Sequence, residues 1–248
     1  MTKNPSPKRR SGEAGAVAPA AVRQPAKTAA PRRAAKPANA GSKRAATGGA
    51  TSYHHGALRD ALLGAAERIL DREGIAGLTL RAAAREAGVS HAAPTHHFGD
   101  LAGLVSELAA IGFRRFGAAL HAAADTAGAD PERRLDAMGQ AYVAFATTYP
   151  GLFTLMFRGE RLDLSRPTLK EAMSEAGAAL AAAVGARREG PPASPLAAAA
   201  DVTRAWALVH GFAVLLLDGR LDHTLSQLPV GMTAADLLGE VLKPPANR

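Results

Sequence analysis

The chain of 248 residues contains no cysteine. Disulfide bonds, a redox-active thiol and a zinc site with cysteine ligands are therefore excluded, and a reducing cytosol is the simplest compartment. Aromatic residues are also scarce, at 4% of the chain, whereas alanine is abundant. This composition favours helices over strands and predicts an all-α fold of one or two domains.

Enzyme signatures are missing as well. The sequence has no glycine-rich phosphate loop, no GxSxG elbow, no HExxH pair and no pair of carboxylates on one helix face. We therefore expect no enzymatic activity, no cofactor and no metal. The histidine pairs 54–55 and 96–97 are the remaining metal candidates, but adjacent helical residues point about 100° apart and no acidic ligand lies between them.

Positive charge is concentrated at the N-terminus. The net charge of the chain is +8, and residues 1–52 hold eleven Lys or Arg with one acidic residue, so the rest of the chain is slightly acidic. This segment has six prolines and no aromatic residue, which predicts a disordered tail. It is either an arm that binds DNA phosphates or a solvated leader; the apolar core of a signal peptide is lacking.

Two short helices joined by a tight turn are predicted between Thr79 and Phe98. Thr79 is suited to be the N-cap of the first helix, and Gly88 to end it, because glycine adopts positive φ without a Cβ clash. Ser90 is the expected cap of the second helix, over 91–97. An apolar stripe at helical spacing marks the buried face of the first helix: Leu80, Ala83, Ala84 and Ala87. This layout is typical of a helix-turn-helix, whose second helix lies in the DNA major groove.

The residues of this region resemble a known family. The stretch AREAGVS, a short helix, HHF and a following acidic residue are similar to the DNA-binding domain of the TetR/AcrR family of bacterial transcriptional regulators. Upstream, residues 53–74, YHHGALRDALLGAAERILDREG, resemble the first helix of that family. Further on, Trp206, His210 and Gly211 resemble the WHG-type C-terminal domain. The resemblance implies a homodimeric regulator that responds to a ligand.

The same resemblance implies which residues contact DNA. His97 would contact phosphate, and five residues on or near the reading helix would face the groove: Ser90, His91, Ala92, Ala93 and Thr95. The full set is Tyr53, His54, His55, Thr79, Ser90, His91, Ala92, Ala93, Thr95, His96 and His97. The chain departs from the family at Thr95, where tyrosine is usual, and at Leu101, where a lysine usually contacts phosphate.

Large side chains gather in the second half of the chain. A long helix is predicted from Gly99-Asp100 to about Leu120, another ends at Pro150-Gly151, and Thr168 with Glu171 and Thr233 with Asp236 form expected capping boxes. The stripe of large side chains is either ordinary core or the lining of a pocket for a small apolar ligand; the resemblance favours the pocket. Its predicted residues are Met138, Tyr142, Phe145, Tyr149, Phe153, Met173, Trp206 and His210, although His210 is also compatible with a hydrogen-bonded core residue.

A helix over 196–217 is apolar on nearly every face from Trp206 onward. Such a helix must be covered on all sides. Thirteen residues are too few to span a bilayer, which needs about 20, so we expect a second subunit to cover it and no membrane contact. With the last helix it would form a four-helix bundle across a two-fold axis, as the resemblance implies. The predicted interface comprises Trp206, Val209, Ala213, Leu216, Leu217, Leu238 and Val241.

Together these observations predict a tail over 1–52, a helix-turn-helix domain over 53–99 and a helical ligand-binding and dimerisation domain over 100–248. The expected function is that of a cytoplasmic homodimeric repressor, released from a palindromic operator by a small apolar effector. A nucleoid-type architectural protein that binds DNA mainly through its tail is the alternative, and a helical ligand carrier that has lost DNA recognition is a more remote one.

Overall fold

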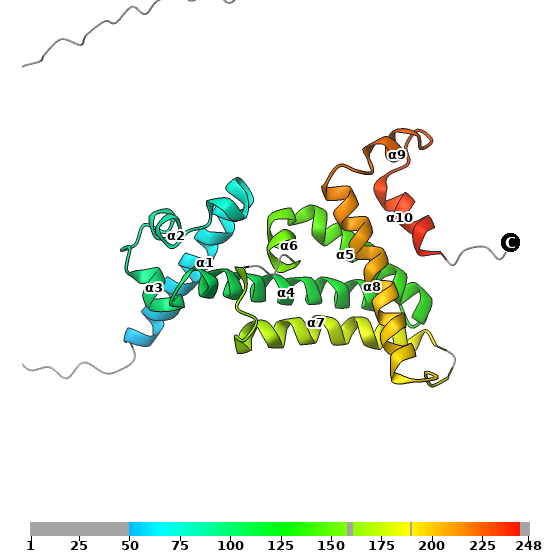
Figure 1. Ribbon diagram of the computed structural model, residues 1–248, viewed down its shortest axis with the longest axis horizontal. Coiled ribbons are helices and arrows are strands. Elements are labelled where there is room, and N and C mark those ends of the chain that lie inside the picture. The colour runs from blue at the N-terminus through cyan, green and yellow to red at the C-terminus, as the bar shows by residue number, and fades with distance from the viewer. Residues whose placement is uncertain (1–49, 158–160, 189, 244–248) are drawn as a thin grey trace, which may run out of the picture. The chain divides into compact units, whose positions relative to one another are not determined.

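The structure is a computed structural model that describes residues 50–157, 161–188 and 190–243, with side chains from Gly56 onward. All regular elements in these ranges are helices, which confirms the all-α class. Residues 1–49 of the predicted tail lie outside the described part. The helices are α1 (Ala50–Gly77), α2 (Leu80–Glu86), α3 (Ala93–Phe98), α4 (Leu101–Thr126), α5 (Pro131–Thr148), α6 (Pro150–Phe157), α7 (Pro167–Ala186), α8 (Pro195–Leu217), α9 (Asp222–Ser226) and α10 (Ala234–Leu242) (Figure 1).

The first helix is longer than the sequence predicts. It begins at Ala50 rather than near Ala57, because no proline interrupts the chain between these residues. Gly74 breaks its regular geometry, as expected, with a φ of 67°. The chain then turns again into helical hydrogen bonding up to Gly77.

The helix-turn-helix is confirmed in its first half. The Thr79 side chain accepts a hydrogen bond from the Ala82 amide at 3.0 Å, and so caps α2. Gly88 adopts a φ of 68°, which carries the chain out of α2. Only glycine reaches this region without strain, so this position fixes the angle between α2 and α3.

The reading helix α3 begins later than predicted. Residues 91–92 form a turn, the N-cap is Ala92, and no side chain caps the helix, so the assignment of Ser90 as the cap is wrong. The Ser90 carbonyl instead accepts from the Ala93 amide at 3.0 Å, which closes the turn. Pro94 lies in the first turn of α3, where a missing N–H is tolerated.

Helix α4 is the central element of the described unit. Asp100 caps it by accepting from the Gly103 amide at 2.8 Å, as predicted, and the helix continues to Thr126, beyond the predicted end. It packs against α5, α6 and α7, and against α1 and α3 of the helix-turn-helix. Two ion pairs, Arg59–Glu107 and Arg115–Glu67, join α1 to α4. Both pairs join residues that are 48 apart in the sequence, so α1 and α4 run in the same general direction where they meet.

Of the predicted ends and starts of later helices, the end at Pro150 and the capping box at α10 hold, and the capping box at α7 fails. Pro150 does end α5, but it also opens α6, because proline is suited to the first helical position. The expected capping box of Thr168 does not form: α7 begins at Pro167, and Thr168 Oγ1 donates to Glu107 Oε1 at 2.9 Å instead. The capping box of Thr233 and Asp236 at α10 is confirmed.

Helix α8 packs against α5 and α7 and buries Val209, Phe212 and Ala213 there. It has 23 residues and a mean hydropathy of 1.4, so length and composition alone would allow it to cross a membrane. Core helices of soluble proteins can meet the same criteria, so the expectation of no membrane contact stays a prediction. Charged residues, Asp201 and Arg204, lie in its first half and form an ion pair with each other.

Candidate nucleic-acid interface and ligand cavity

Most of the predicted DNA contacts that the structure describes are exposed to solvent. Ser90, His91 and Ala92 in the turn are exposed, as are Thr95 and His96 on α3 and Thr79 at the start of α2. Ala93 and His97 are half-buried. The side chains of Tyr53, His54 and His55 lie outside the described part. We call the described residues of this group the reading surface.

The opposite side of α3 is fixed by burial. Pro94 and Phe98, four residues apart and therefore on one helix face, are buried against the core. The Phe98 ring also lies 5.7 Å from the Arg59 guanidinium carbon, a cation–π distance. Because one face of α3 is buried and held, its polar face is presented to solvent in a defined orientation.

A buried carboxylate, Glu107 of α4, organises the residues behind α3. Its Oε2 atom pairs with Arg59 Nη2 of α1 at 2.5 Å. Its Oε1 atom accepts from Thr168 and lies 3.7 Å from Arg166 Nη1. Arg166 in turn donates from Nη2 to the Phe98 carbonyl at the end of α3, at 2.9 Å. We call Arg59, Phe98, Glu107, Arg166 and Thr168 the junction cluster, because it joins α1, α3, α4 and the start of α7.

The arginines of α1 and α2 near the reading surface differ in their surroundings. Arg81 and Arg85 of α2 are exposed beside the reading surface. Arg59 is not comparable with them, because it is engaged by Glu107 and Phe98 in the junction cluster. Arg59 therefore has a structural role in the junction cluster.

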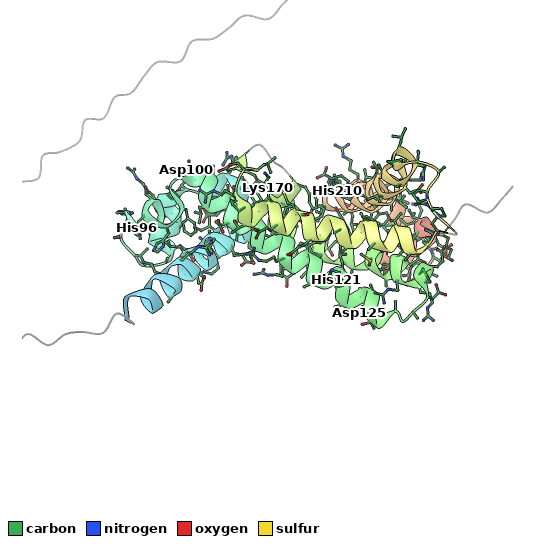
Figure 2. The ribbon with its side chains drawn as sticks, turned by 90° about the horizontal axis from the view of Figure 1, so that it is seen from below. His96, Asp100, His121, Asp125, Lys170 and His210 are labelled. Carbon is green, nitrogen blue, oxygen red and sulfur yellow. The ribbon has the colours of Figure 1, made fainter. Side chains whose placement is uncertain are left out.

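A second site lies between α4, α5, α7 and α8. It is a cavity of about 460 Å³, lined mainly by aromatic and aliphatic side chains, among them Phe113, Phe116, Met156, Phe157 and Leu162. Of the predicted pocket residues, Met138, Tyr142, Met173 and Trp206 line it. The other four, Phe145, Tyr149, Phe153 and His210, are not among its lining residues: the Phe145 ring packs behind the lining residue Phe116, with ring centres 5.2 Å apart, and the Tyr149 ring lies 5.6 Å from the Arg115 guanidinium carbon. Figure 2 shows the two regions apart, with His96 near α3 and His210 on α8.

Hydrogen bonds order one wall of the cavity. Trp206 Nε1 donates to the Tyr142 hydroxyl at 3.2 Å, and the hydroxyl lies 2.8 Å from His210 Nδ1. Burial raises the pKa of the Tyr142 phenol and lowers the pKa of His210. Both shifts favour neutral groups, so this wall presents hydrogen-bonded polar atoms without charge.

Among the described residues that line the cavity, only Asp136 and Arg187 are charged. Burial raises the pKa of the Asp136 carboxyl, and Arg187 opposes that rise. Arg187 pairs with the exposed Glu132 at 2.5 Å. The two charges are of opposite sign, so the cavity as a whole fits a mainly apolar molecule.

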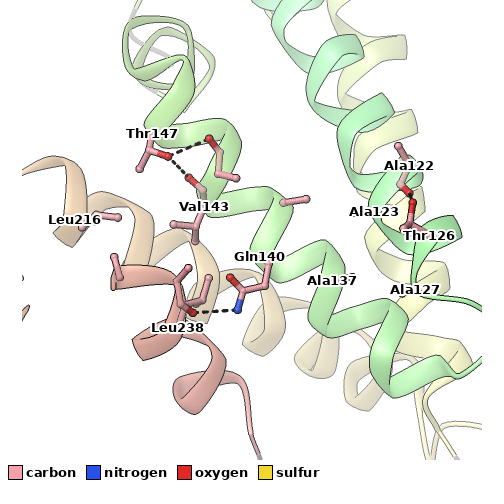
Figure 3. Close-up of a pocket in the computed structure, with 14 residues that line it drawn as sticks. Ala122, Ala123, Thr126, Ala127, Ala137, Gln140, Val143, Thr147, Leu216 and Leu238 are labelled. Carbon is pink, nitrogen blue, oxygen red and sulfur yellow. Dashed lines mark hydrogen bonds between the residues drawn. The ribbon is translucent and has the colours of Figure 1, made fainter. Parts of the chain in front are cut away.

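An open groove beside α10 was not predicted. It measures about 820 Å³ and lies between α4, α5 and α10, with mostly alanine side chains along its walls (Figure 3). Gln140 crosses it and donates to the Ala235 carbonyl at 3.3 Å. Small side chains at helical spacing are the signal that sequence reasoning missed.

The predicted interface residues divide into two groups. Val209, Ala213 and Leu238 are buried within the single chain, so their predicted place at an interface is revised. Trp206 and Val241 are exposed, and Leu216 and Leu217 are half-buried. Apolar residues absent from the prediction add to this surface, namely Leu208, Val214 and Leu215. We call the exposed residues Trp206, Leu208, Val214, Leu215 and Val241 the α8–α10 face.

Helix placement and the reading surface together define a helix-turn-helix DNA-binding protein. Comparisons extend this class to a family. A family model described as "Bacterial regulatory proteins, tetR family" matches residues 62–108, and one described as "Tetracyclin repressor-like, C-terminal domain" matches residues 135–231. The chain belongs to the TetR family and is a DNA-binding transcriptional regulator. The second match includes Trp206, His210 and Gly211.

Two solved structures illustrate the similarity. A protein of unknown function from Rhodococcus sp. RHA1 is 35% identical, with a TM-score of 0.63, over 77% of this chain and 95% of that chain. A TetR family transcription regulator from Marinobacter aquaeolei VT8 is 16% identical, with a TM-score of 0.53, over 77% and 96% respectively, and supports the fold alone. A comparison with curated protein sequences found no match.

Proposed function

We propose that the chain is a homodimeric repressor that binds a palindromic operator and is released from it by a small, mainly apolar molecule. The observation that carries this proposal is one helix, α4, with the helix-turn-helix packed at its beginning and the cavity beside its middle. Glu107, in its second turn, belongs to the junction cluster, and Phe113 and Phe116 line the cavity. A change in the cavity therefore acts on the helix that supports α3.

Release of DNA follows from differential binding. A ligand lowers operator affinity only if it binds more tightly to a conformation in which the two reading helices no longer fit the DNA. A typical coupling is about 1–3 kcal/mol, or roughly 5- to 150-fold in affinity. The cavity suits an apolar ligand because its lining has few polar groups, and those of Tyr142 and Trp206 are already hydrogen-bonded.

Dimerisation is supported by the α8–α10 face. Several large apolar side chains on it are more than a third exposed in the single chain, among them Trp206 at 43% and Leu215 at 44%. Large apolar side chains that stay exposed in the single chain are candidates for an interaction site. An isologous contact across a two-fold axis would cover it and place two reading helices on one palindrome, with half-sites about 34–36 Å apart or a multiple of that distance.

The test is selection of genomic fragments that the full chain binds, followed by sequencing. A repressor of this kind enriches one palindromic motif upstream of a small number of genes. An architectural protein that binds mainly through its tail would retain fragments without a shared motif, and this result would overturn the proposal. Deleting residues 1–49 is the matched control, because a regulator keeps the motif without them.

A further inference from the structure

The short segment between α6 and α7 joins the cavity wall to the reading helix. Leu162 and Leu164 in this segment line the cavity. Two residues after Leu164, the Arg166 guanidinium donates to the carbonyl of Phe98, the last residue of α3. Cavity and reading helix are therefore connected by a few residues of backbone and one side chain.

Hydrogen bonds hold this segment together as one turn. The Asp163 amide donates to the buried Ser106 hydroxyl of α4 at 2.8 Å. The Ser165 amide and hydroxyl donate to Asp163 Oδ1 at 3.0 and 2.6 Å, and the Arg166 amide donates to the Asp163 carbonyl at 3.2 Å. A displacement at Leu162 or Leu164 consequently moves Asp163 and Arg166 with it.

The position of Arg166 is tightly restricted and incompletely satisfied. A Cβ atom on the buried Gly103 would collide with the Arg166 guanidinium and with the Phe98 carbonyl, so the absence of a side chain there gives the guanidinium its place. Arg166 Nε is buried without a hydrogen bond, while Asp163 Oδ2 lies 3.5 Å away. An unpaired buried N–H is costly, and a small shift of the turn would bring it into hydrogen-bonding distance of Asp163. Asp163 is therefore the nearest acceptor available to Arg166 Nε if the turn shifts.

We propose that Arg166 is a positioning residue that couples the cavity to DNA recognition. This inference rests on the proposed function. With the cavity empty, Arg166 holds the end of α3 through Phe98 and lies beside Glu107. A ligand that displaces Leu162 and Leu164 draws Arg166 toward Asp163, and the end of α3 loses its hydrogen bond. The reading surface then loses the orientation that a DNA half-site requires.

The absence of cysteine from the chain permits a direct test. Leu164 lines the cavity and is 52% exposed, so the single thiol of Leu164→Cys is accessible to reagents. Benzyl methanethiosulfonate adds bulk at the cavity wall, and methyl methanethiosulfonate provides a control of the same chemistry. Each adduct is prepared with Arg166, with Arg166→Met and with Arg166→Lys. The readouts are amide hydrogen exchange over residues 93–103 and affinity for the selected DNA fragment.

With Arg166 present, the benzyl adduct is expected to speed exchange over residues 93–103 by about five-fold relative to the methyl adduct. DNA affinity is expected to fall by about ten-fold, and reduction of the adduct restores both values. In the Arg166→Met background the benzyl group changes neither readout. Arg166→Lys recovers part of the response, because the lysine still donates to the Phe98 carbonyl. A benzyl group on Val230→Cys, at a fully exposed loop position, changes neither value.

Equal benzyl effects with Arg166 and with Arg166→Met would overturn the proposal, as would unchanged exchange over residues 93–103 with Arg166 present. The exchange readout does not depend on DNA. If it responds as expected while no genomic fragment is selected, the coupling is supported and the proposed repressor function is overturned. If a motif is selected but the exchange does not respond, the function stands and the role of Arg166 is refuted.

Discussion

Replacing Glu107 with glutamine removes the charge at the centre of the junction cluster while keeping its shape. In the unmodified protein the carboxylate accepts from Arg59 and Thr168 and lies near Arg166. A glutamine amide offers one oxygen and one NH2 group in its place. The NH2 group must then face donors that the carboxylate oxygen accepted from or attracted. At least one hydrogen bond to a charged group is therefore lost.

The loss of folding stability in Glu107→Gln can be estimated from the exposed fractions of the side chains. Exposed ion pairs contribute about 0–1 kcal/mol, and breaking a buried pair costs about 3–5 kcal/mol. The Glu107 side chain is only 10% exposed, but those of Arg59 and Arg166 are 37% and 28% exposed and can regain water. We therefore expect a loss of about 2–3 kcal/mol. For a chain of this size that lowers the melting temperature by about 5–10 °C.

Thermal unfolding followed by circular dichroism measures this loss. Glu240→Gln is the matched control, because the Glu240–Lys243 pair has the same chemistry with side chains that are 70% and 61% exposed. It is expected to cost less than about 0.5 kcal/mol. If the two variants lowered the melting temperature equally, Glu107 would contribute no more than a surface pair, and the junction cluster would not hold α1, α3 and α4 together.

The reading surface, the α8–α10 face, the tail and the cavity wall each give a further expected outcome. His91→Ala or Thr95→Ala is expected to relax base preference at defined positions of the selected motif, because a base-edge contact is worth about 1–3 kcal/mol; motifs unchanged in both variants would show that α3 is misplaced. Leu215→Glu puts a charge on the apolar face and is expected to convert a dimer to monomers in sedimentation at micromolar concentration; a monomeric unmodified protein would contradict this. Removing residues 1–49 is expected to reduce the slope of log affinity against log salt by about 0.9 for each tail contact with phosphate, whereas equal slopes would mean that the tail stays off the DNA. Burial lowers the pKa of His210, so the folded chain binds fewer protons there than the unfolded chain; stability is full above about pH 6.5 and is lost as the pH falls through the lowered pKa, a loss that His210→Asn is expected to reduce in thermal unfolding.

Local patterns in the sequence predicted the helix-turn-helix well. Thr79, Gly88 and Asp100 act where their chemistry requires, because a cap or a positive φ depends on neighbours within a few residues. The same local reasoning failed at Ser90 and Thr168. Each has the side chain of a cap, but the chain enters the helix elsewhere, and Thr168 donates to Glu107, 61 residues away.

Contacts between residues far apart in the sequence were harder to predict than local structure. Met138, Tyr142 and Phe145 lie on one helix and Tyr149 caps its end, yet only the first two line the cavity, because the packing of neighbouring helices decides which apolar side chains face it. The sequence alone does not reveal the role of Arg59. Its actual partners, Glu107 and Phe98, come from elements whose packing no sequence period reveals.

The interface prediction is revised at three of its seven residues for a related reason. Val209 and Ala213 of α8 and Leu238 of α10 are apolar, like Leu208 and Leu215, but they are buried within the single chain. A helix that is apolar on every face does not show which side is covered by its own chain and which by a partner. The structure separates them, and leaves the α8–α10 face as the surface that a second subunit would cover.

Footprinting of a selected genomic fragment with the full chain tests the central claim most directly. The account predicts two protected half-sites on one side of the duplex, related by a two-fold axis and centred about 10–10.5 base pairs apart or a multiple of that spacing. The protection should weaken in the Thr95→Ala variant at the base positions that α3 contacts. A continuous protection without half-sites, indifferent to Thr95 and abolished by removing residues 1–49, would contradict the account and identify the tail as the DNA-binding element.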